Sequence, residues 1–513
     1  DKKTTVRKLR VRVKKCEGKR MVVTPPNGDG SGLSLQVNGY DKRKIYYPEP
    51  GYHPGWNFPK IKVEAGDTIV LSSKHHWSFL DLFGVEGVPG CPVVITADEG
   101  IVRIDRGIRL ADAKYVKITG RPRGDTLQSY PNGSEDFRIQ IRGEDIIGDK
   151  KGLGHGGVGI DILGRSAHVE VDMIRVERKA YGVMAKQDPT CDSMYNYPNW
   201  IMDDVHIHHC YFENILQDVL YLGNTDPLGT RQITCNNSIV NYKPVRLSNF
   251  HLHHNRILIA NRTGIQLGGA ETGVSKIHDN YISDCGYEFN QQQGTGISIG
   301  GMSRNVHVYN NIIKRTFLYG IFDLGTDSSF VYNNHVDSSG FLDMRLYPHS
   351  LNLDSLAAAM RAIEVQGHLV LNRYMNGITN IQSTTKETFP HYTKTVFYMN
   401  NVLGVNTSKA DSKGIISFAE WGPPGDWTEN SVVCNNMRTD GKPATIETFR
   451  YKGDDWPVYS DDCADSPFEK NPNRKKSKPV QKNKGISRTV IAGGAISLVA
   501  IVLLYVIFRK KGS

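Results

Sequence analysis

Four acidic residues occupy equivalent places in the chain, each a few positions after a run with strand periodicity. They are Asp188, Asp226, Glu271 and Asp327. If these runs stack as neighbouring strands, carboxylates on adjacent runs lie about 5 Å apart, and those on alternate runs about 10 Å apart. These separations bracket the distances between the paired carboxyl groups of retaining and inverting glycosidases. The pattern therefore predicts acid–base chemistry by Asp188, Asp226 and Glu271. The alternative for each acid is an ordinary turn-forming role.

Cations and aromatic residues accompany these acids. Lys186 stands two positions before Asp188 and is predicted to act as a base or as a charge-neutralising cation. Arg304 and Asp327 are predicted to contact the substrate. Four aromatic residues in the long loops are candidates for stacking on sugar rings, namely Tyr195, Tyr197, Trp200 and Tyr242. The alternative for these aromatic residues is packing of the loops on the scaffold.

Two long insertions interrupt consecutive repeats. Residues 187–204 and 224–249 separate strand-like runs that are elsewhere joined by a few residues. Long loops on a rigid scaffold are commonly functional, so these two are expected to rise from one side and wall a binding face. Cys191 and Cys235 lie in the two insertions, and we expect a disulfide between them.

A sequence repeat must form the scaffold that positions these residues. An Asn follows each alternating run, and Asn255 and Asn280 lie 25 residues apart. A Gly-Ile pair recurs at Gly264, Gly296 and Gly320. The period is too short for a four-stranded propeller blade, and the leucine-rich pattern is absent. The sequence predicts an all-β, right-handed parallel β-helix with three short strands per coil.

Each repeated feature has a predicted structural role. The Asn residues are expected to adopt the left-handed turn conformation and to hydrogen-bond the Asn above and below. Alternate apolar residues are expected to form stacked inward rows. The predicted inward residues are Leu252, Ile265, Leu267, Ile297, Ile299, Val308, Ile321 and Leu324.

On these repeats, and on the runs VEAGDTIVLSS (63–73), PVVITADEG (92–100) and YVKITG (115–120), the chain resembles the pectin-lyase-like superfamily. The resemblance covers roughly residues 60 to 455. It implies a polysaccharide-acting protein, of lyase, glycoside hydrolase or epimerase type. In a lyase of this fold, a Lys or Arg removes the C5 proton of a uronate, and calcium or another cation neutralises the uronate carboxylate. The fold also hosts non-catalytic adhesins and spacers, so the alternative is a structural or envelope-assembly component.

The His and Cys residues give weaker signals. His206, His208, His251 and His253 alternate outward on strands without a matching carboxylate or thiol set, so no metal site is predicted there. Cys210 occupies the position of the repeating Asn and is expected to be a buried thiol. None of the eight cysteines forms a CxxC pair.

The formal charge of +10 is concentrated at the C-terminus. Residues 470–488 carry +8 and residues 509–511 carry +3, which leaves −1 for residues 1–469. A nearly neutral main body argues against nucleic acid as a partner. Between the two basic clusters, residues 489–508 contain no charge and are long enough to cross a bilayer core, so they are predicted to form a single transmembrane helix.

These features predict five regions: an N-terminal β cap (1–59), the β-helix (60–455), a coil end with a basic stalk (456–488), the membrane helix (489–508) and a basic tail (509–513). A chain starting at Asp1 is expected to follow a removed signal peptide, which places the β-helix outside the cytoplasm. Expected partners are an envelope glycan, the membrane and envelope proteins. The basic stalk opposes this orientation, and a cytoplasmic tail-anchored protein is the alternative.

Overall fold

The computed structural model describes most of the repeat region and little of the two ends. The described residues are 16–36, 62–121, 137–143, 157–225, 231–288, 293–301, 303–324, 326, 328–337, 339, 401–403 and 431–449, together with the strands at 377–382, 396–399, 415–420 and 459–460. The predicted stalk, membrane segment and basic tail lie outside the described residues. Within the described ranges, no helix is long and apolar enough to cross a membrane.

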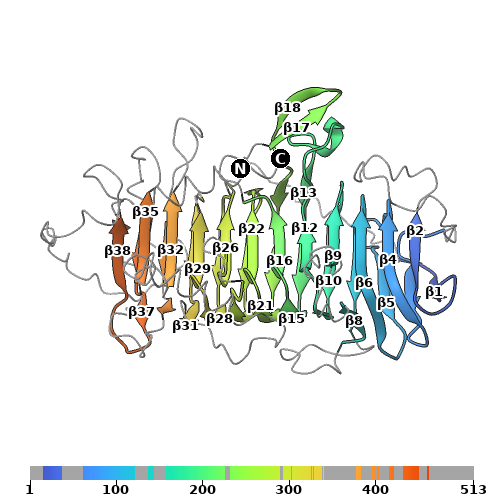
Figure 1. Cartoon of the computed structure of the whole chain (residues 1–513), viewed down its shortest axis with the longest axis horizontal. Coiled ribbons are helices and arrows are strands. Elements are labelled where there is room, and N and C mark those ends of the chain that lie inside the picture. Colours follow the sequence, from blue (N-terminus) through green and yellow to red (C-terminus); the bar gives the residue numbers. More distant parts are fainter. Residues whose placement is uncertain are drawn as a thin grey trace, which may run out of the picture.

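The chain coils around three faces of parallel strands (Figure 1). Face 1 is a 13-stranded sheet of β1 (Arg20–Val23), β3 (Thr68–Leu71), β5 (Val93–Ala97), β7 (Lys114–Thr119), β10 (Ala167–Asp172), β14 (Val205–His208), β20 (His251–His253), β24 (Ser275–His278), β27 (Val306–Tyr309), β30 (Ser329–Tyr332), β33 (Val396–Met399), β36 (Ser431–Cys434) and β39 (Tyr459–Ser460). All its neighbouring pairs are parallel, as the sequence predicted.

Faces 2 and 3 share one 21-stranded sheet, joined where the long strand β6 pairs with both β8 and β9. Face 2 consists of β8 (Ile139–Arg142), β11 (Ile174–Glu177), β15 (Tyr211–Ile215), β21 (Arg256–Ala260), β25 (Tyr281–Cys285), β28 (Ile312–Thr316), β31 (His335–Asp337), β34 (Val402–Leu403) and β37 (Met437–Arg438). Face 3 consists of β2 (Ser31–Gln36), β4 (His76–Phe83), β6 (Val102–Ala111), β9 (Val158–Leu163), β12 (Tyr181–Ala185), β16 (Leu220–Gly223), β22 (Ile265–Gly268), β26 (Ile297–Gly300), β29 (Ile321–Leu324), β32 (Gly377–Gln382), β35 (Ile415–Glu420) and β38 (Thr445–Phe449).

The long insertions form the remaining elements. A short three-stranded sheet of β13 (Ile201–Asp203), β19 (Arg246–Ser248) and β23 (Ala270–Thr272) lies between face 3 and face 1 in chain order. The hairpin β17 (Arg231–Cys235) and β18 (Ser238–Tyr242) is antiparallel and projects from the coil in Figure 1. A single 3₁₀ turn, η4 (Ser193–Tyr195), lies in the first insertion.

The N-terminal strands continue the coil. β1 pairs in parallel with β3, and β2 pairs in parallel with β4, so both belong to the same faces as the repeats. The parallel coil therefore begins inside the range predicted as an N-terminal cap. Cys16 and Cys91 form a disulfide that ties this first coil to the loop before β5.

Alternate apolar residues fill the interior, as predicted, with one exception. Seven of the eight predicted inward residues are buried, but Leu324 is half-buried. Asp323 takes the inward position opposite Ile299 instead. Its carboxylate accepts hydrogen bonds from the hydroxyls of Thr326, Ser329 and Tyr398, which compensates the burial of a polar group. The prediction for Leu324 was wrong because the inward position near the end of this strand is taken by the polar cluster around Asp323 and not by an apolar residue.

The repeated Asn residues form the predicted ladder. Asn255, Asn280, Asn311, Asn334 and Asn401 are all nearly fully buried, and each side-chain amide donates to the side-chain oxygen of the next. The predicted backbone conformation was wrong by one residue. The left-handed φ belongs to the residue before each of the first four, at His254, Asp279, Asn310 and Asn333. The Asn itself turns inward, where its amide hydrogen-bonds a backbone N–H and a carbonyl of the preceding coil.

The Gly-Ile pairs mark a close approach between coils. A Cβ on Gly296 would lie 2.4 Å from Ile313 Cγ2 and 2.7 Å from the Gly320 carbonyl oxygen. A Cβ on Gly264 would lie 2.7 Å from the Gly296 carbonyl oxygen. These distances are too short for any side chain, so the repeated glycine is required by packing at the entrance to face 3.

Candidate functional site

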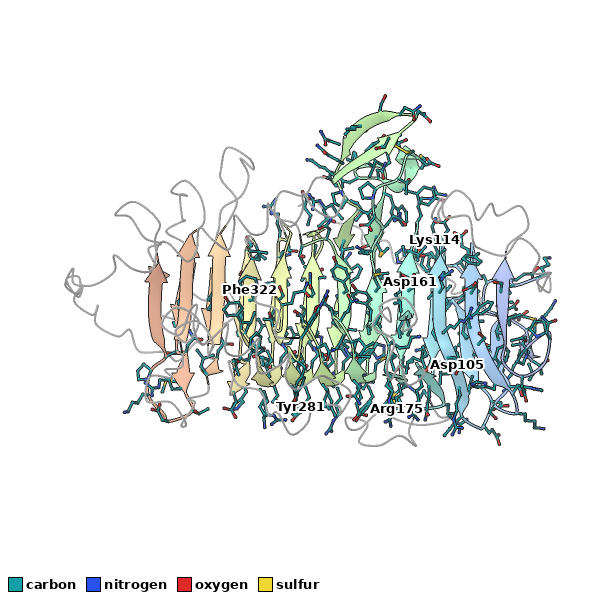
Figure 2. All side chains as sticks on the ribbon, viewed as in Figure 1. Asp105, Lys114, Asp161, Arg175, Tyr281 and Phe322 are labelled. Carbon is teal, nitrogen blue, oxygen red and sulfur yellow. A yellow bond between two sulfur atoms is a disulfide. The ribbon has the colours of Figure 1, made fainter. Side chains whose placement is uncertain are left out.

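The two insertions are joined into one projecting structure, which we call the stapled loops (residues 187–200 and 231–242). Cys191 and Cys235 form the predicted disulfide between them. In Figures 1 and 2 the stapled loops stand above the central coils, on the side where the face 3 strands end. The sequence therefore correctly placed both insertions on one side of the molecule.

Two of the predicted sugar-stacking residues fasten the stapled loops to the coil. The Tyr195 hydroxyl donates to Asp112 Oδ2 at 2.8 Å, and burial raises the pKa of this phenol. Trp200 packs against the main apolar core, and the Lys114 ammonium lies 5.6 Å from its ring centroid; Lys114 is labelled beneath the loops in Figure 2. These contacts agree with the packing alternative for Tyr195 and Trp200.

Tyr197 lies close to positive charge. The Lys243 ammonium is 5.8 Å from its ring centroid and the Arg246 guanidinium is 5.7 Å away. Tyr242 is half-buried at the base of the hairpin. The Arg304 backbone N–H donates to the Ala270 carbonyl, which places Arg304 beside β23. The described members of the predicted substrate-binding set therefore lie in the stapled loops or beside the short sheet at their base, and their role in binding remains a prediction.

Glu271 forms an ion pair with a buried arginine. Its Oε2 atom lies 3.1 Å from Arg246 Nε, and the Arg246 side chain is only 1% exposed. Arg246 also donates to the Gly301 carbonyl oxygen. A buried guanidinium needs a counter-charge, so the Glu271 carboxylate stabilises the folded arrangement of β19 and β23. Its predicted catalytic role remains a prediction.

Lys186 and Asp188 lie together at the end of β12. Lys186 Nζ is 3.3 Å from Asp188 Oδ2, with Asp188 about half exposed (49%) and Lys186 mostly covered (17%). The same ammonium lies 4.8 Å from the centroid of the Tyr221 ring. Tyr221 stacks in turn on Tyr181, with ring centroids 5.7 Å apart. A cation, an accessible carboxylate and two aromatic rings thus meet beside the stapled loops.

The remaining predicted acids cannot be placed. Asp226 and Asp327 lie outside the described residues.

Tyr221 belongs to an outward row of face 3, in register with Met184, Gln266, Ser298 and Phe322. Figure 2 labels Phe322 on this face, together with Asp161 of β9, which pairs with Met184. This row crosses five coils, from Met184 beside the stapled loops to Phe322 on β29.

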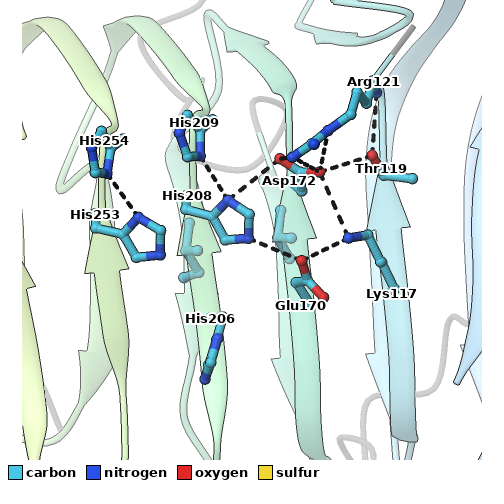
Figure 3. A network of polar contacts seen from close by, with 12 residues as sticks. Lys117, Thr119, Arg121, Glu170, Asp172, His206, His208, His209, His253 and His254 are labelled. Carbon is cyan, nitrogen blue, oxygen red and sulfur yellow. Dashed lines mark hydrogen bonds and ion pairs between the residues drawn. The ribbon is translucent and has the colours of Figure 1, made fainter. Parts of the chain in front are cut away.

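A second cluster lies on face 1 and was missed by the sequence analysis (Figure 3). His208, His253 and His278 occupy equivalent outward positions on β14, β20 and β24, and their rings stack at 4.7 and 4.9 Å between centroids. His209 and His254 stand in the turn after the first two strands and stack on each other at 4.8 Å. We call these five imidazoles the histidine face.

Carboxylates border the histidine face on β10. Glu170 Oε1 lies 3.0 Å from His208 Nε2 and 2.7 Å from Lys117 Nζ, as drawn in Figure 3. The hydrogen bond with His208 is the largest cause that holds the pKa of Glu170 at about 2. Asp172 is fully buried, lies 3.4 Å from His208 Nδ1, and is bound by Arg121. Burial lowers the pKa of His253 to about 2 and that of His209 to about 4.

The prediction that the outward histidines form no metal site therefore rested on a wrong premise. It assumed that no carboxylates accompany the outward histidines, whereas β10 supplies two of them and β24 is followed by Asp279. The available signal was the repetition of HIHHC (206–210), HLHHN (251–255) and KIHDN (276–280) in one register. Residues of β7, β10 and β14 also line a pocket of about 170 Å³. That volume is smaller than typical ligand pockets, so it offers no substrate site by itself.

Neither a family model nor a curated protein matches the sequence. Among solved structures, the chain is similar to a lacto-N-biosidase from Eubacterium ramulus (11% identity, covering 82% of this chain and 67% of that one, TM-score 0.43). It is also similar to a pectate lyase from Bacillus sp. N165 (14%, 66% and 93%, 0.31) and an alginate lyase from Paenibacillus sp. str. FPU-7 (10%, 75% and 92%, 0.28). Likeness at this level concerns the fold alone.

Proposed function

We propose that the protein binds an acidic polysaccharide along face 3, beside the stapled loops. One observation carries this proposal: the Lys186 ammonium lies against the Tyr221 ring and 3.3 Å from the exposed Asp188 carboxylate. Aromatic rings stack on the apolar faces of sugars, and a neighbouring cation binds a uronate carboxylate. Both parts of such a ligand therefore find a partner at one place on two neighbouring coils.

The exposed position of Asp188 makes this site accessible to a ligand. An ion pair with a half-exposed carboxylate is weakened, because water screens the exposed charge of Asp188. A uronate carboxylate can displace Asp188 from Lys186 at little cost, while its ring contacts Tyr221. The partly exposed Met184 lies in register beside Tyr221 and extends this surface on one side, whereas Gln266 and Ser298 on the other side are buried. A chain is consequently a better ligand than a monosaccharide.

Cleavage of the bound chain is the second candidate. The closeness of Lys186 to Asp188 favours it, since a lyase needs a base and a hydrolase needs a carboxylate at the bound sugar. The ion pairs nevertheless favour binding. An ammonium ion that is held by a carboxylate cannot accept the C5 proton, and Glu271 is occupied by Arg246. Asp226, Asp188 and Glu271 remain the proposed acid–base set if cleavage occurs, and calcium remains the proposed cation of a lyase.

We further propose that residues 489–508 anchor the protein in a membrane, with the coil outside the cytoplasm. The disulfides Cys16–Cys91 and Cys191–Cys235 support an exported location, because such bonds form and persist in oxidising compartments. In this setting the ligand is an envelope or environmental glycan. The competing role is that of a rigid, non-catalytic spacer or adhesive component, for which the same coil and anchor would serve.

Calorimetric titration of the full-length chain in detergent tests the binding proposal. Polygalacturonate and alginate are compared with dextran, a neutral control. We expect the acidic chains alone to bind, and Lys186→Gln and Tyr221→Ala each to weaken binding at least tenfold. Lys62→Gln is a matched control, because Lys62 forms a similar surface ion pair with Glu64 far from the site. Equal affinities for dextran, or equal effects of the Lys62 and Lys186 variants, would refute the proposal.

The same mixtures distinguish binding from cleavage. Absorbance of unsaturated uronates reports a lyase, and new reducing ends without that absorbance report a hydrolase. Binding without either product supports the binding protein that we propose. If no acidic chain binds and no product forms, the spacer or adhesive role replaces it.

A further inference from the structure

Three consecutive coils end their face 1 strands with a pair of metal-binding residue types. The pairs are His208–His209, His253–His254 and His278–Asp279. The second member of each pair has a left-handed φ of 54°, 55° and 53°, respectively. This conformation brings its side chain beside that of its predecessor. The Nδ1 atoms are 2.8 Å apart in the first pair and 2.9 Å apart in the second, and His278 Nδ1 is 2.7 Å from Asp279 Oδ2.

The first set of three imidazoles is gathered closely enough to share one ion. One ring nitrogen from each of His208, His209 and His253 lies within 4.8 Å of the other two. Nitrogens bound to zinc at about 2.1 Å with tetrahedral angles lie about 3.4 Å apart. His208 Nδ1 and His209 Nδ1 lie 2.8 Å apart and the other separations are at most 4.8 Å, so rotations of the side chains, above all of the stacked His253 ring, would complete the geometry.

Neighbouring carboxylates orient the central ring. His208 Nε2 faces Glu170 Oε1 at 3.0 Å, which places the Nε2 proton on the side of Glu170. His208 Nδ1 then directs its lone pair toward His209 Nδ1, 2.8 Å away. A carboxylate behind a ligating histidine is the arrangement that fixes tautomers in metal sites. Lys117 and Arg121 in turn hold Glu170 and Asp172 in place.

Ring stacking alone does not account for the turn histidines. The stack on face 1 continues past His278 with Tyr309 and Tyr332, at 4.6 and 4.9 Å. In those coils the turn position holds Asn310 and Asn333, which adopt the left-handed conformation readily. His209 and His254 replace Asn at this position only beside the other histidines, among the coils that the structure describes. Their presence adds nitrogen ligands that the stack does not need.

We propose that His208, His209 and His253 bind a divalent transition metal ion of the zinc class. Three imidazole nitrogens suit zinc, cobalt, nickel or copper and do not suit calcium, which prefers oxygen. Three protein ligands leave a fourth position open for water or an anion. The adjacent set of His254, His278 and Asp279 also lies within 4.8 Å, but the first set has the further support of Glu170, whose carboxylate is hydrogen-bonded to its central ligand His208. The proposal therefore commits to the first set.

Titration of the full-length, tag-free chain with Co²⁺ and Zn²⁺ tests this site. We expect one equivalent of Co²⁺ to give the visible spectrum of a four-coordinate ion, and Zn²⁺ to displace it. His253→Asn and His209→Asn should each weaken Zn²⁺ binding at least 100-fold. His209→Asn recreates the residue present at positions 310 and 333, so it preserves the turn even if His253→Asn impairs folding. Glu170→Gln should weaken binding about tenfold to 100-fold through the orientation of His208.

The matched control is His251→Asn. His251 lies on the same face and stacks on His206 at 4.6 Å, but it belongs to neither set. Its replacement should leave Zn²⁺ affinity unchanged. The proposal is overturned if the wild type binds no Co²⁺ in a four-coordinate form. It is also overturned if His251→Asn weakens binding as much as His209→Asn, or if His278→Asn abolishes binding while His209→Asn does not.

Discussion

The Asn ladder offers the most quantitative prediction. Asn311 lies in its middle, and its side chain takes part in four hydrogen bonds. Its oxygen accepts from the backbone N–H and the side-chain amide of Asn280, at 3.1 and 2.9 Å. Its own amide donates to the Ile277 carbonyl and to Asn334 Oδ1, both at 2.9 Å. All four bonds are buried. The substitution Asn311→Ala removes every one of them and takes a hydrogen-bond partner from polar groups of both neighbouring coils.

The expected loss in unfolding free energy follows from these bonds. A typical buried hydrogen bond contributes about 1 kcal/mol net, and four of them contribute about 4 kcal/mol. The backbone N–H of Asn280 and the carbonyl of Ile277 would also remain buried without the Asn311 side chain as a partner. This penalty adds to the lost hydrogen bonds, so the loss in unfolding free energy should not fall below this value. Urea unfolding followed by far-ultraviolet circular dichroism measures the difference between wild type and variant.

A variant of the next residue is the control for a substitution at the start of β28. Ile312 follows Asn311 directly and is exposed, so Ile312→Thr should change stability by less than about 0.5 kcal/mol. If Asn311→Ala also costs less than about 1 kcal/mol, the ladder does not hold the coils together. The repeated Asn would then serve only to shape the turn.

Three further predictions test other parts of the molecule. Cys235→Ser should make the stapled loops (residues 187–200 and 231–242) sensitive to limited proteolysis while the circular dichroism of the coil persists; unchanged protease resistance would mean that packing by Tyr195 and Trp200 suffices. Gly296→Ala should lower the melting temperature by several degrees, because the new Cβ would lie 2.4 Å from Ile313 Cγ2; an unchanged value would show that the coils separate easily. Burial raises the pKa of Asp218 to about 6, so the folded state binds its proton more tightly than the unfolded state. Ionisation should lower the unfolding free energy by about 2.4 kcal/mol as pH rises from 4 to 7, and Asp218→Asn should be more stable than wild type at pH 7 but not at pH 4; equal stabilities at both values would contradict this.

The sequence predicted those parts of the fold that repeat. Period-two apolar patterns and the Asn and Gly-Ile spacings indicated parallel coils, because every coil must present the same residue types at the same places. The Cys191–Cys235 disulfide followed from two insertions on consecutive coils. The left-handed φ of the turn was predicted one residue too late in the chain. Both members of a pair such as Asn310–Asn311 tolerate a left-handed φ, and only the structure shows which amide turns inward.

The candidate site was harder to predict. Ion pairs such as Arg246–Glu271 join residues from different coils, and their partners depend on side-chain direction within irregular insertions. The histidine face was missed for a similar reason. Its carboxylates, Glu170 and Asp172, precede the histidines by a whole coil, and the register of β10 with β14 brings them together. Asp323 shows the same limit in the core, where three hydroxyls from later segments satisfy one buried carboxylate.

The location of the bound glycan tests the central proposal most directly. Hydrogen–deuterium exchange of the full-length chain, with and without saturating polygalacturonate oligomers, would map it along the sequence. We predict slower exchange in residues 181–188 and 220–225, which carry Lys186, Asp188 and Tyr221, and in the stapled loops. Protection confined to the strands of face 1, or no protection at saturating ligand, would contradict the proposal that face 3 binds an acidic polysaccharide.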